Sequence, residues 1–81
     1  MSAMAEPFDV PIRDESIRLG QFLKLADAVD QGGDVRALLA TSAVRVNGQV
    51  EVRRGRQLVP GDVVEVGYVS YLLTEGPPPD R

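Results

Sequence analysis

The residues best suited to chemistry in this sequence are arginines gathered around one short stretch. Residues 44–56 read VRVNGQVEVRRGR and hold four arginines against one glutamate, although the chain of 81 residues carries a net charge of −3. The guanidinium group of arginine presents its N–H donors in a planar fork that fits the oxygens of a phosphate. The stretch therefore indicates that the protein binds a polyanion, through Arg45, Arg53, Arg54 and Arg56.

Charge is segregated along the whole chain. The segment from Arg36 to Arg56 has five arginines and one acidic residue, a balance of +4, whereas the remainder has four basic and eleven acidic residues, a balance of −7. A solvated strand face that discourages edge pairing is the alternative explanation for such a run. We favour polyanion binding because the basic residues of this segment are all arginines, and because those after Arg36 flank an expected hairpin.

The composition excludes much catalytic chemistry. The chain has no histidine and no cysteine, so no hydroxyl group has an imidazole to activate it and zinc would have carboxylate ligands alone. Asp27, Asp30 and Asp34 could be considered as a metal cluster, but loosely spaced acidic residues around a turn are usually solvated. We expect no enzyme activity, no cofactor, no metal site and no disulfide.

Length and the terminal sequences predict one small domain over residues 8–74, between a flexible N-terminus over 1–7 and a flexible, proline-rich tail over 75–81. The N-terminus lacks a basic region followed by an apolar run, and no stretch reaches membrane-spanning length. We therefore expect a cytoplasmic monomer with no membrane partner.

The elements that must position the arginines follow from the spacing of apolar residues. FDVPI, residues 8–12, alternates and contains Pro11, which predicts an edge strand or an extended arm. Apolar residues spaced three or four apart predict a helix over 19–29 and another over 34–42, joined by a tight turn at Gly32 and Gly33. Arg36 is expected on the outer face of the second helix.

Asn47 and Gly48, between alternating valines, predict a β-hairpin. A two-residue turn would mix apolar and polar residues on each face, so we favour an odd-numbered loop with Gly48 left-handed as a bulge. In that register Val44 faces Val50, and the outer face carries Arg45, Gln49, Glu51 and Arg53.

Two further strands are expected in the second half of the chain. One covers Val63 to Val66 after a turn at Pro60-Gly61-Asp62, and a last one lies within YVSYLLTE, residues 68–75. The predicted fold is α+β, with a helical hairpin packed on a small, bent antiparallel sheet.

Residues 17–66 resemble the S-four RNA-binding domain, named after small-subunit ribosomal protein four, and in particular its small stand-alone bacterial members. The resemblance is carried by LGQFLK, by V-x-VNG at residues 44–48, by RRGR and by PGD at residues 60–62, in that order. It implies the fold called the alpha-L motif and the binding of structured RNA, of the ribosomal or transfer class, through the helical pair and the adjoining hairpin. The contacts implied by position are Lys24, Arg36, Arg45, Asn47, Arg53, Arg54 and Arg56.

The chain departs from the family pattern at two places. Many relatives have Ser-Arg where this chain has Gln31-Gly32, which removes one basic contact, and the glycine common before the hairpin strand is Ser42 here. Both departures predict a lower affinity than is usual in the family. Backbone N–H groups near Gly32 and Gly33 could instead approach a phosphate, although a plain turn is the simpler interpretation.

Two other functions remain as alternatives. A protein-binding adaptor could use the same arginine-rich face for acidic partners. VNGQVEV followed by GD-x-VEV also resembles β-grasp sulfur carriers, but those need a C-terminal Gly-Gly, whereas this chain ends in GPPPDR. We therefore predict a non-enzymatic RNA-binding protein that contacts its RNA mainly through phosphates.

Overall fold

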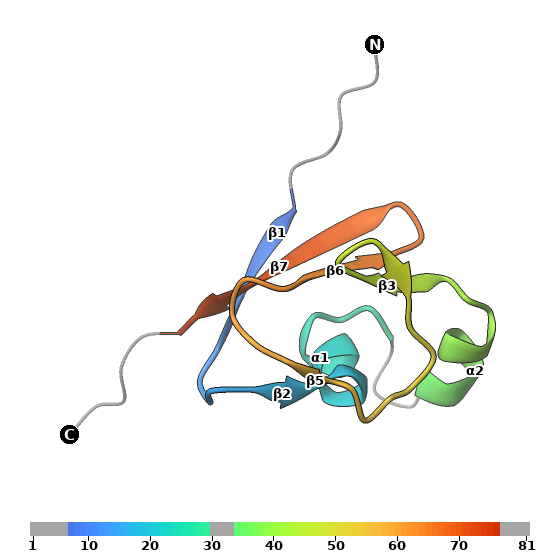
Figure 1. Cartoon of the computed structure of the whole chain (residues 1–81), viewed down its shortest axis with the longest axis horizontal. Helices are drawn as coiled ribbons and strands as arrows, with labels where there is room; N and C mark the ends of the chain where they lie inside the picture. The colour runs from blue at the N-terminus through green and yellow to red at the C-terminus, as the bar shows by residue number, and fades with distance from the viewer. Residues whose placement is uncertain (1–6, 30–33, 77–81) are drawn as a thin grey trace, which may run out of the picture.

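The computed structural model of the chain describes residues 7–29 and 34–76 and shows an α+β protein (Figure 1). Its five-stranded sheet has the strand order β1-β7-β6-β3-β4, and β2 and β5 form a separate two-stranded sheet. Among the described residues, no helix is long and apolar enough to cross a membrane. The elements in chain order are β1 (Phe8–Ile12), β2 (Ile17–Arg18), α1 (Leu19–Leu25), α2 (Val35–Ala40), β3 (Val44–Val46), β4 (Gln49–Val50), β5 (Gln57–Leu58), β6 (Val63–Val66) and β7 (Val69–Glu75).

Both helices and the small β2–β5 sheet lie on one side of the large sheet (Figure 1). The core forms between these layers because both helices and most of the strands contribute apolar side chains, with a period of three to four residues in helices and of two in strands. The side chains that form the core are each less than a tenth exposed. The core consists of Ile12, Leu19, Phe22, Leu23, Val35, Leu39, Val44, Val46, Leu58, Val64 and Leu73.

The large sheet is mixed, so the prediction of an antiparallel sheet was wrong at one strand. β1 is the expected edge strand, but it runs parallel to β7, with Phe8 opposite Tyr71 and Ile12 opposite Glu75. The other pairings are antiparallel. The alternation of FDVPI fixes which side chains face the core, but it carries no information on strand direction. β7 also continues to Glu75, one residue beyond the expected end of the domain.

The first helix is shorter than predicted because a left-handed residue ends it. α1 stops at Leu25, and Asp27 has a φ of +63°. The N–H of Ala28 donates to the carbonyl of Leu23 at 2.8 Å, and the N–H of Asp27 donates to that of Lys24 at 3.1 Å. This is the Schellman arrangement of hydrogen bonds at a helix end.

The second helix lies within its predicted range, and its ends show why. The Asp34 carboxylate accepts hydrogen bonds from the N–H groups of Arg36 and Ala37, at 3.0 and 3.3 Å, and so caps the first turn. At the other end, Ser42 has a φ of +60°. Glycine adopts this left-handed conformation readily, which gives a physical reason for the glycine that the family resemblance implies at this position. The predicted turn at Gly32 and Gly33 lies outside the described residues, as do Asp30, Gln31 and most of the two expected flexible ends.

The hairpin turn at Asn47-Gly48 is confirmed, but the predicted register was wrong. The loop has two residues, with Arg45 opposite Val50 and Val46 opposite Gln49. Asn47 and Gly48 have φ values of +53° and +87°, as a type I′ turn requires. The N–H of Glu51 therefore reaches the carbonyl of Val44 at 3.0 Å.

The sequence argument failed because it treated Glu51 as an outward-facing residue and Val50 and Val52 as inward-facing ones. Glu51 is 6% exposed, whereas Val50 and Val52 are 50% and 56% exposed. Burial of a carboxylate is tolerated only where hydrogen bonds and opposite charges compensate for lost water. Such compensation is present around Glu51, next to the arginines of the candidate site.

Candidate RNA-binding site

The Glu51 carboxylate organises part of the arginine-rich loop after the hairpin. Its Oε2 accepts hydrogen bonds from the N–H groups of Val52 and Arg53 at 3.1 and 3.0 Å, and from Nε of Arg53 at 3.0 Å. Its Oε1 accepts from the guanidinium groups of Arg53 and Arg56 at 3.3 and 2.9 Å. We call Glu51, Arg53 and Arg56 the Glu51 cluster.

The electrostatics of the Glu51 cluster favour the ionised carboxylate. Hydrogen bonds from the side chain and backbone of Arg53 lower the pKa of Glu51 from 4.5 to about 2, although burial acts in the opposite direction. The same ion pair raises the pKa of Arg53. The side chain of Arg53 remains 73% exposed and that of Arg56 34% exposed. Each arginine therefore keeps N–H donors that face water.

The loop held by the Glu51 cluster in turn positions the start of α1. The N–H of Leu19 donates to the carbonyl of Arg56 at 2.8 Å, and the N–H of Gly20 donates to that of Arg54 at 2.9 Å. A Cβ atom at position 20 would lie 3.4 Å from Cβ of Arg54. That distance is an ordinary van der Waals contact, so the two backbone hydrogen bonds, rather than the lack of a side chain at Gly20, place Arg54 beside the helix.

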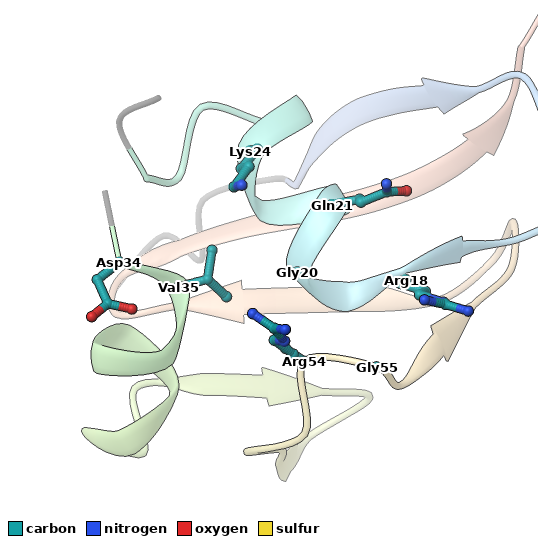
Figure 2. Close-up of a pocket in the computed structure, with 8 residues that line it drawn as sticks. All are labelled: Arg18, Gly20, Gln21, Lys24, Asp34, Val35, Arg54 and Gly55. Carbon is teal, nitrogen blue, oxygen red and sulfur yellow. The ribbon is translucent and has the colours of Figure 1, made fainter. Parts of the chain in front are cut away.

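A pocket of about 320 Å³ lies where this loop meets the two helices. Figure 2 shows the Arg54 side chain reaching between α1 and the start of α2, with Lys24 farther along α1 and Arg18 toward the other end of the pocket. Gln21 adds an amide to the same wall. The pocket also has one acidic residue, Asp34, whose carboxylate is occupied in capping α2.

A second pocket, also of about 320 Å³, lies on the other side of Arg54. Its lining includes Arg36 from α2 and the exposed Val52. Arg54 lines both pockets, so it links the positive charges of α1 with that of α2. We call the four residues Arg18, Lys24, Arg36 and Arg54 the basic surface. Within the described part of the chain, none of the four forms an ion pair.

The remaining two residues of the predicted site lie elsewhere. Arg45 is exposed on β3, directly opposite Glu65 of β6. The side chain of Asn47 is used within the fold, because its Nδ2 donates to Asp62 at 3.1 Å and its Oδ1 accepts from the N–H of Val63 at 3.0 Å. Neither Arg45 nor Asn47 lines either of the two pockets.

Arg18 is the site residue that sequence reasoning missed. It lies close to Asp14 and Glu15 in the part of the chain outside residues 36–56, which has a net negative balance, so charge counting did not single it out. The sequence offered one signal for Arg18, which is its position directly before the predicted first helix. In the structure Arg18 is the extended residue that precedes the first turn of α1. Gly32 and Gly33, where a phosphate approach was considered beside the simpler interpretation of a plain turn, lie outside the described residues.

Metal binding finds no support among the residues that the structure describes, where no group of three or more potential ligands is placed together. Asp27 and Asp34 belong to separate structural features, the end of α1 and the cap of α2. Asp30, the third residue of the considered cluster, is not among the described residues.

The chain is similar to known proteins over nearly its whole length. It is 48% identical over 71 residues to a protein of Bacillus subtilis (strain 168) named "Probable ribosome maturation protein RlbA", a match that covers 86% of this chain and 97% of that protein. No solved structure matches the chain significantly. The family model described as the S4 domain, the S-four domain of the sequence resemblance, matches residues 10–74, and the chain belongs to that family.

Proposed function

We propose that this chain is a non-enzymatic, cytoplasmic, monomeric protein that binds structured RNA mainly through phosphates, using the basic surface. Membership of the S4-domain family supports RNA as the polyanion. The name of the Bacillus subtilis relative, a probable ribosome maturation protein, favours ribosomal RNA over transfer RNA. The same family match favours this function over the sulfur-carrier alternative, and the helices with the adjoining hairpin would act as the alpha-L motif.

The observation that carries the proposal is the position of Arg54. Its guanidinium group lies between two helices that each present another cation, and no described carboxylate neutralises it. Phosphates of a folded RNA approach a protein from several directions, so cations on separate elements can contact several of them together. Arg54 is therefore expected to make the central contact, with Lys24 and Arg18 on one side and Arg36 on the other.

The other predicted contacts are proposed as secondary. Arg53 and Arg56 hold Glu51 and can offer only their remaining donors to RNA. Asn47 would have to share an amide that already bonds Asp62 and Val63. Arg45 would contribute at the edge of the interface, because Glu65 lies opposite it.

The test reverses charge on the basic surface without touching the Glu51 cluster. Binding of purified ribosomal RNA, transfer RNA and unstructured poly(A) would be measured at several salt concentrations for Arg54→Glu and for Lys24→Glu with Arg54→Glu. Arg13→Glu is the matched control, because Arg13 is exposed in a bend and lines neither pocket. Thermal melting of each variant reports whether it folds.

The unaltered protein should bind the folded RNAs more tightly than poly(A), with a slope of log K against log salt of about −3 to −5 for four to six phosphate contacts. The double variant should lose affinity by about 100-fold or more, since a hydrogen bond to a charged group contributes about 1.5–3 kcal/mol. Arg13→Glu should lose far less RNA affinity, and the melting temperatures of the double variant and of Arg13→Glu should not shift appreciably.

Retained RNA binding in a folded double variant would overturn the site. Equal binding to heparin and to folded RNA would overturn RNA recognition itself. The adaptor alternative predicts that a cell-lysate pull-down keeps acidic protein partners after ribonuclease treatment and loses them in the Lys24→Glu, Arg54→Glu variant. The RNA proposal predicts that ribonuclease alone removes every partner whose capture depends on Arg54.

A further inference from the structure

A second concave surface lies on a different side of α1 from the basic surface. It is a groove of about 650 Å³ between β1 and the end of α1. Phe8 and Leu25 contribute large apolar side chains that are 63% and 55% exposed. Gln21 and Lys24 line the basic pocket, whereas Leu25 and Ala26 line this groove, so one short helix separates the two. We call this feature the Phe8–Leu25 groove.

The groove exists because α1 ends early. The Schellman arrangement stops the helix at Leu25. The inward-facing side chains of β1 and β7 that lie beyond the helix are therefore left uncovered. The Phe8 and Tyr71 rings lie 6.1 Å apart between centroids, and Tyr71 meets Phe22 edge-on at 6.0 Å. This row of rings runs from the groove into the core, and its outer member, Phe8, remains largely exposed to water.

The charge on this groove is opposite to that of the basic surface. Asp9 and Asp27 are exposed residues that line it, and no lysine or arginine among residues 7–29 and 34–76 does so. Exposed apolar side chains bordered by polar residues are typical of surfaces that bind another protein. Carboxylates at the rim would favour partners with basic side chains and disfavour acidic ones.

We propose that the Phe8–Leu25 groove binds a short basic segment of a partner protein, with an apolar side chain of that segment seated against Phe8 and Leu25 and flanking lysines or arginines beside Asp9 and Asp27. β1 is an edge strand, but Pro11 removes one of its N–H donors. Side chains rather than added strand pairing therefore make the contact. The protein would thus bind RNA on one side of α1 and a basic protein segment on the other.

The test is an NMR titration of the full chain with synthetic 12-residue peptides. The probe peptide contains two leucines flanked by lysines in a glycine background. One comparison peptide replaces lysine with glutamate, and another replaces leucine with glycine. We expect saturable binding of the probe alone below about 1 mM, with amide shifts concentrated at Phe8, Asp9 and residues 25–27.

Variants locate the contact and separate its two components. Phe8→Ala with Leu25→Ala should weaken probe binding at least tenfold, whereas Val50→Ala, an equally exposed valine on the opposite edge strand, should leave it unchanged. Asp9→Asn with Asp27→Asn should weaken it several-fold and remove its salt dependence. Asparagine is chosen at position 27 because it tolerates the left-handed conformation there. Asp14→Asn is the matched charge control.

Four results would overturn the proposal. They are equal binding of the glutamate peptide, equal binding of the peptide without leucine, unchanged affinity in the folded Phe8→Ala, Leu25→Ala variant, and no binding of the probe at all. A dimer in sedimentation that Phe8→Ala dissociates would also overturn it, because the occupant would then be a second copy. Arg54→Glu should retain peptide binding, so failure of the RNA proposal would be visible separately.

Discussion

The Glu51 cluster and the basic surface use the same kind of side chain for different purposes. In the cluster, Arg53 and Arg56 are bonded to a buried carboxylate and fix the loop that contacts the start of α1. On the basic surface, Arg54 and Arg36 face two pockets without an acidic partner in the described chain. Adjacent arginines in one RRGR segment are thus divided between holding the site and presenting charge to a ligand.

The comparison shows that the two arrangements depend on each other. The Glu51 cluster shapes residues 51–56, and carbonyls of that loop accept hydrogen bonds from the first N–H groups of α1. Arg54 owes its place between the helices to this arrangement. Weakening the cluster should therefore change stability first and RNA affinity only indirectly, whereas weakening the basic surface should do the reverse.

The largest expected change in stability comes from Glu51→Gln, which keeps the side-chain shape but removes the charge. Hydrogen bonds to charged groups contribute about 1.5–3 kcal/mol each, and several converge on this carboxylate. We expect unfolding free energy to fall by about 2–3 kcal/mol in urea denaturation. Glu65→Gln is the control, since Glu65 forms no ion pair within the described chain. Equal stability of the two variants would show that the cluster does not hold the fold.

The pH dependence of the unfolding free energy should report the ionisation of the same Glu51 carboxylate. The pKa of Glu51 is about 2 in the folded protein and about 4.5 in its ordinary state. Because the folded pKa is the lower one, the unfolded chain takes up a proton first as the pH falls. The contribution of Glu51 is therefore complete above about pH 5 and is lost progressively between about pH 4.5 and 2.

Urea melts of the unaltered protein and of Glu51→Gln, at intervals from pH 7 to pH 2, check this dependence. The difference in unfolding free energy between the two should be constant at neutral pH and should shrink toward acid. A difference that stays constant down to pH 2 would mean that Glu51 is not held in the ionised form by its arginines.

Arg54→Gln and Arg53→Gln should give opposite patterns. Arg54→Gln removes the central phosphate contact, so RNA affinity should fall about tenfold and the salt slope should become shallower by about 1, with an unchanged melt. Arg53→Gln should lower the melting temperature and move the pKa of Glu51 back toward 4.5, with a smaller loss of affinity. Filter binding and carboxyl-carbon NMR titration measure the two effects. Identical behaviour of both variants would remove the distinction between the cluster and the basic surface.

The fold was predictable from sequence to the extent that local patterns determine it. The helical period starting at Leu19, the Asn47-Gly48 turn and the Pro60-Gly61 turn each depend on a few neighbouring residues, and each was confirmed. The direction of β1 and the early end of α1 were not predictable in the same way. The direction of β1 depends on its pairing with β7, which is distant in the sequence, and the end of α1 depends on one left-handed residue, Asp27.

The candidate site was predictable in composition but not in organisation. Arginine counting found the segment that contains Arg53, Arg54 and Arg56, but it could not separate those that hold Glu51 from the one that faces the helices. That separation follows from the burial of Glu51, which the preference for apolar interiors argued against. Arg18 was missed because it comes close to Arg54 only through folding.

The smallest effect on RNA affinity and stability is expected for Arg45→Gln. This variant tests an arginine in a third structural environment, outside both the Glu51 cluster and the basic surface. Arg45 lies on β3 opposite Glu65, is exposed, and lines neither pocket of the basic surface. An exposed substitution of this kind shifts stability by about 0.5 kcal/mol or less. RNA affinity should fall less than threefold, because Glu65 already offsets part of the charge that Arg45 presents. The same filter-binding assay, run beside Arg54→Gln, provides the measurement. A loss as large as that of Arg54→Gln would extend the RNA interface across the sheet to β3, and the basic surface would then be only one part of a wider site.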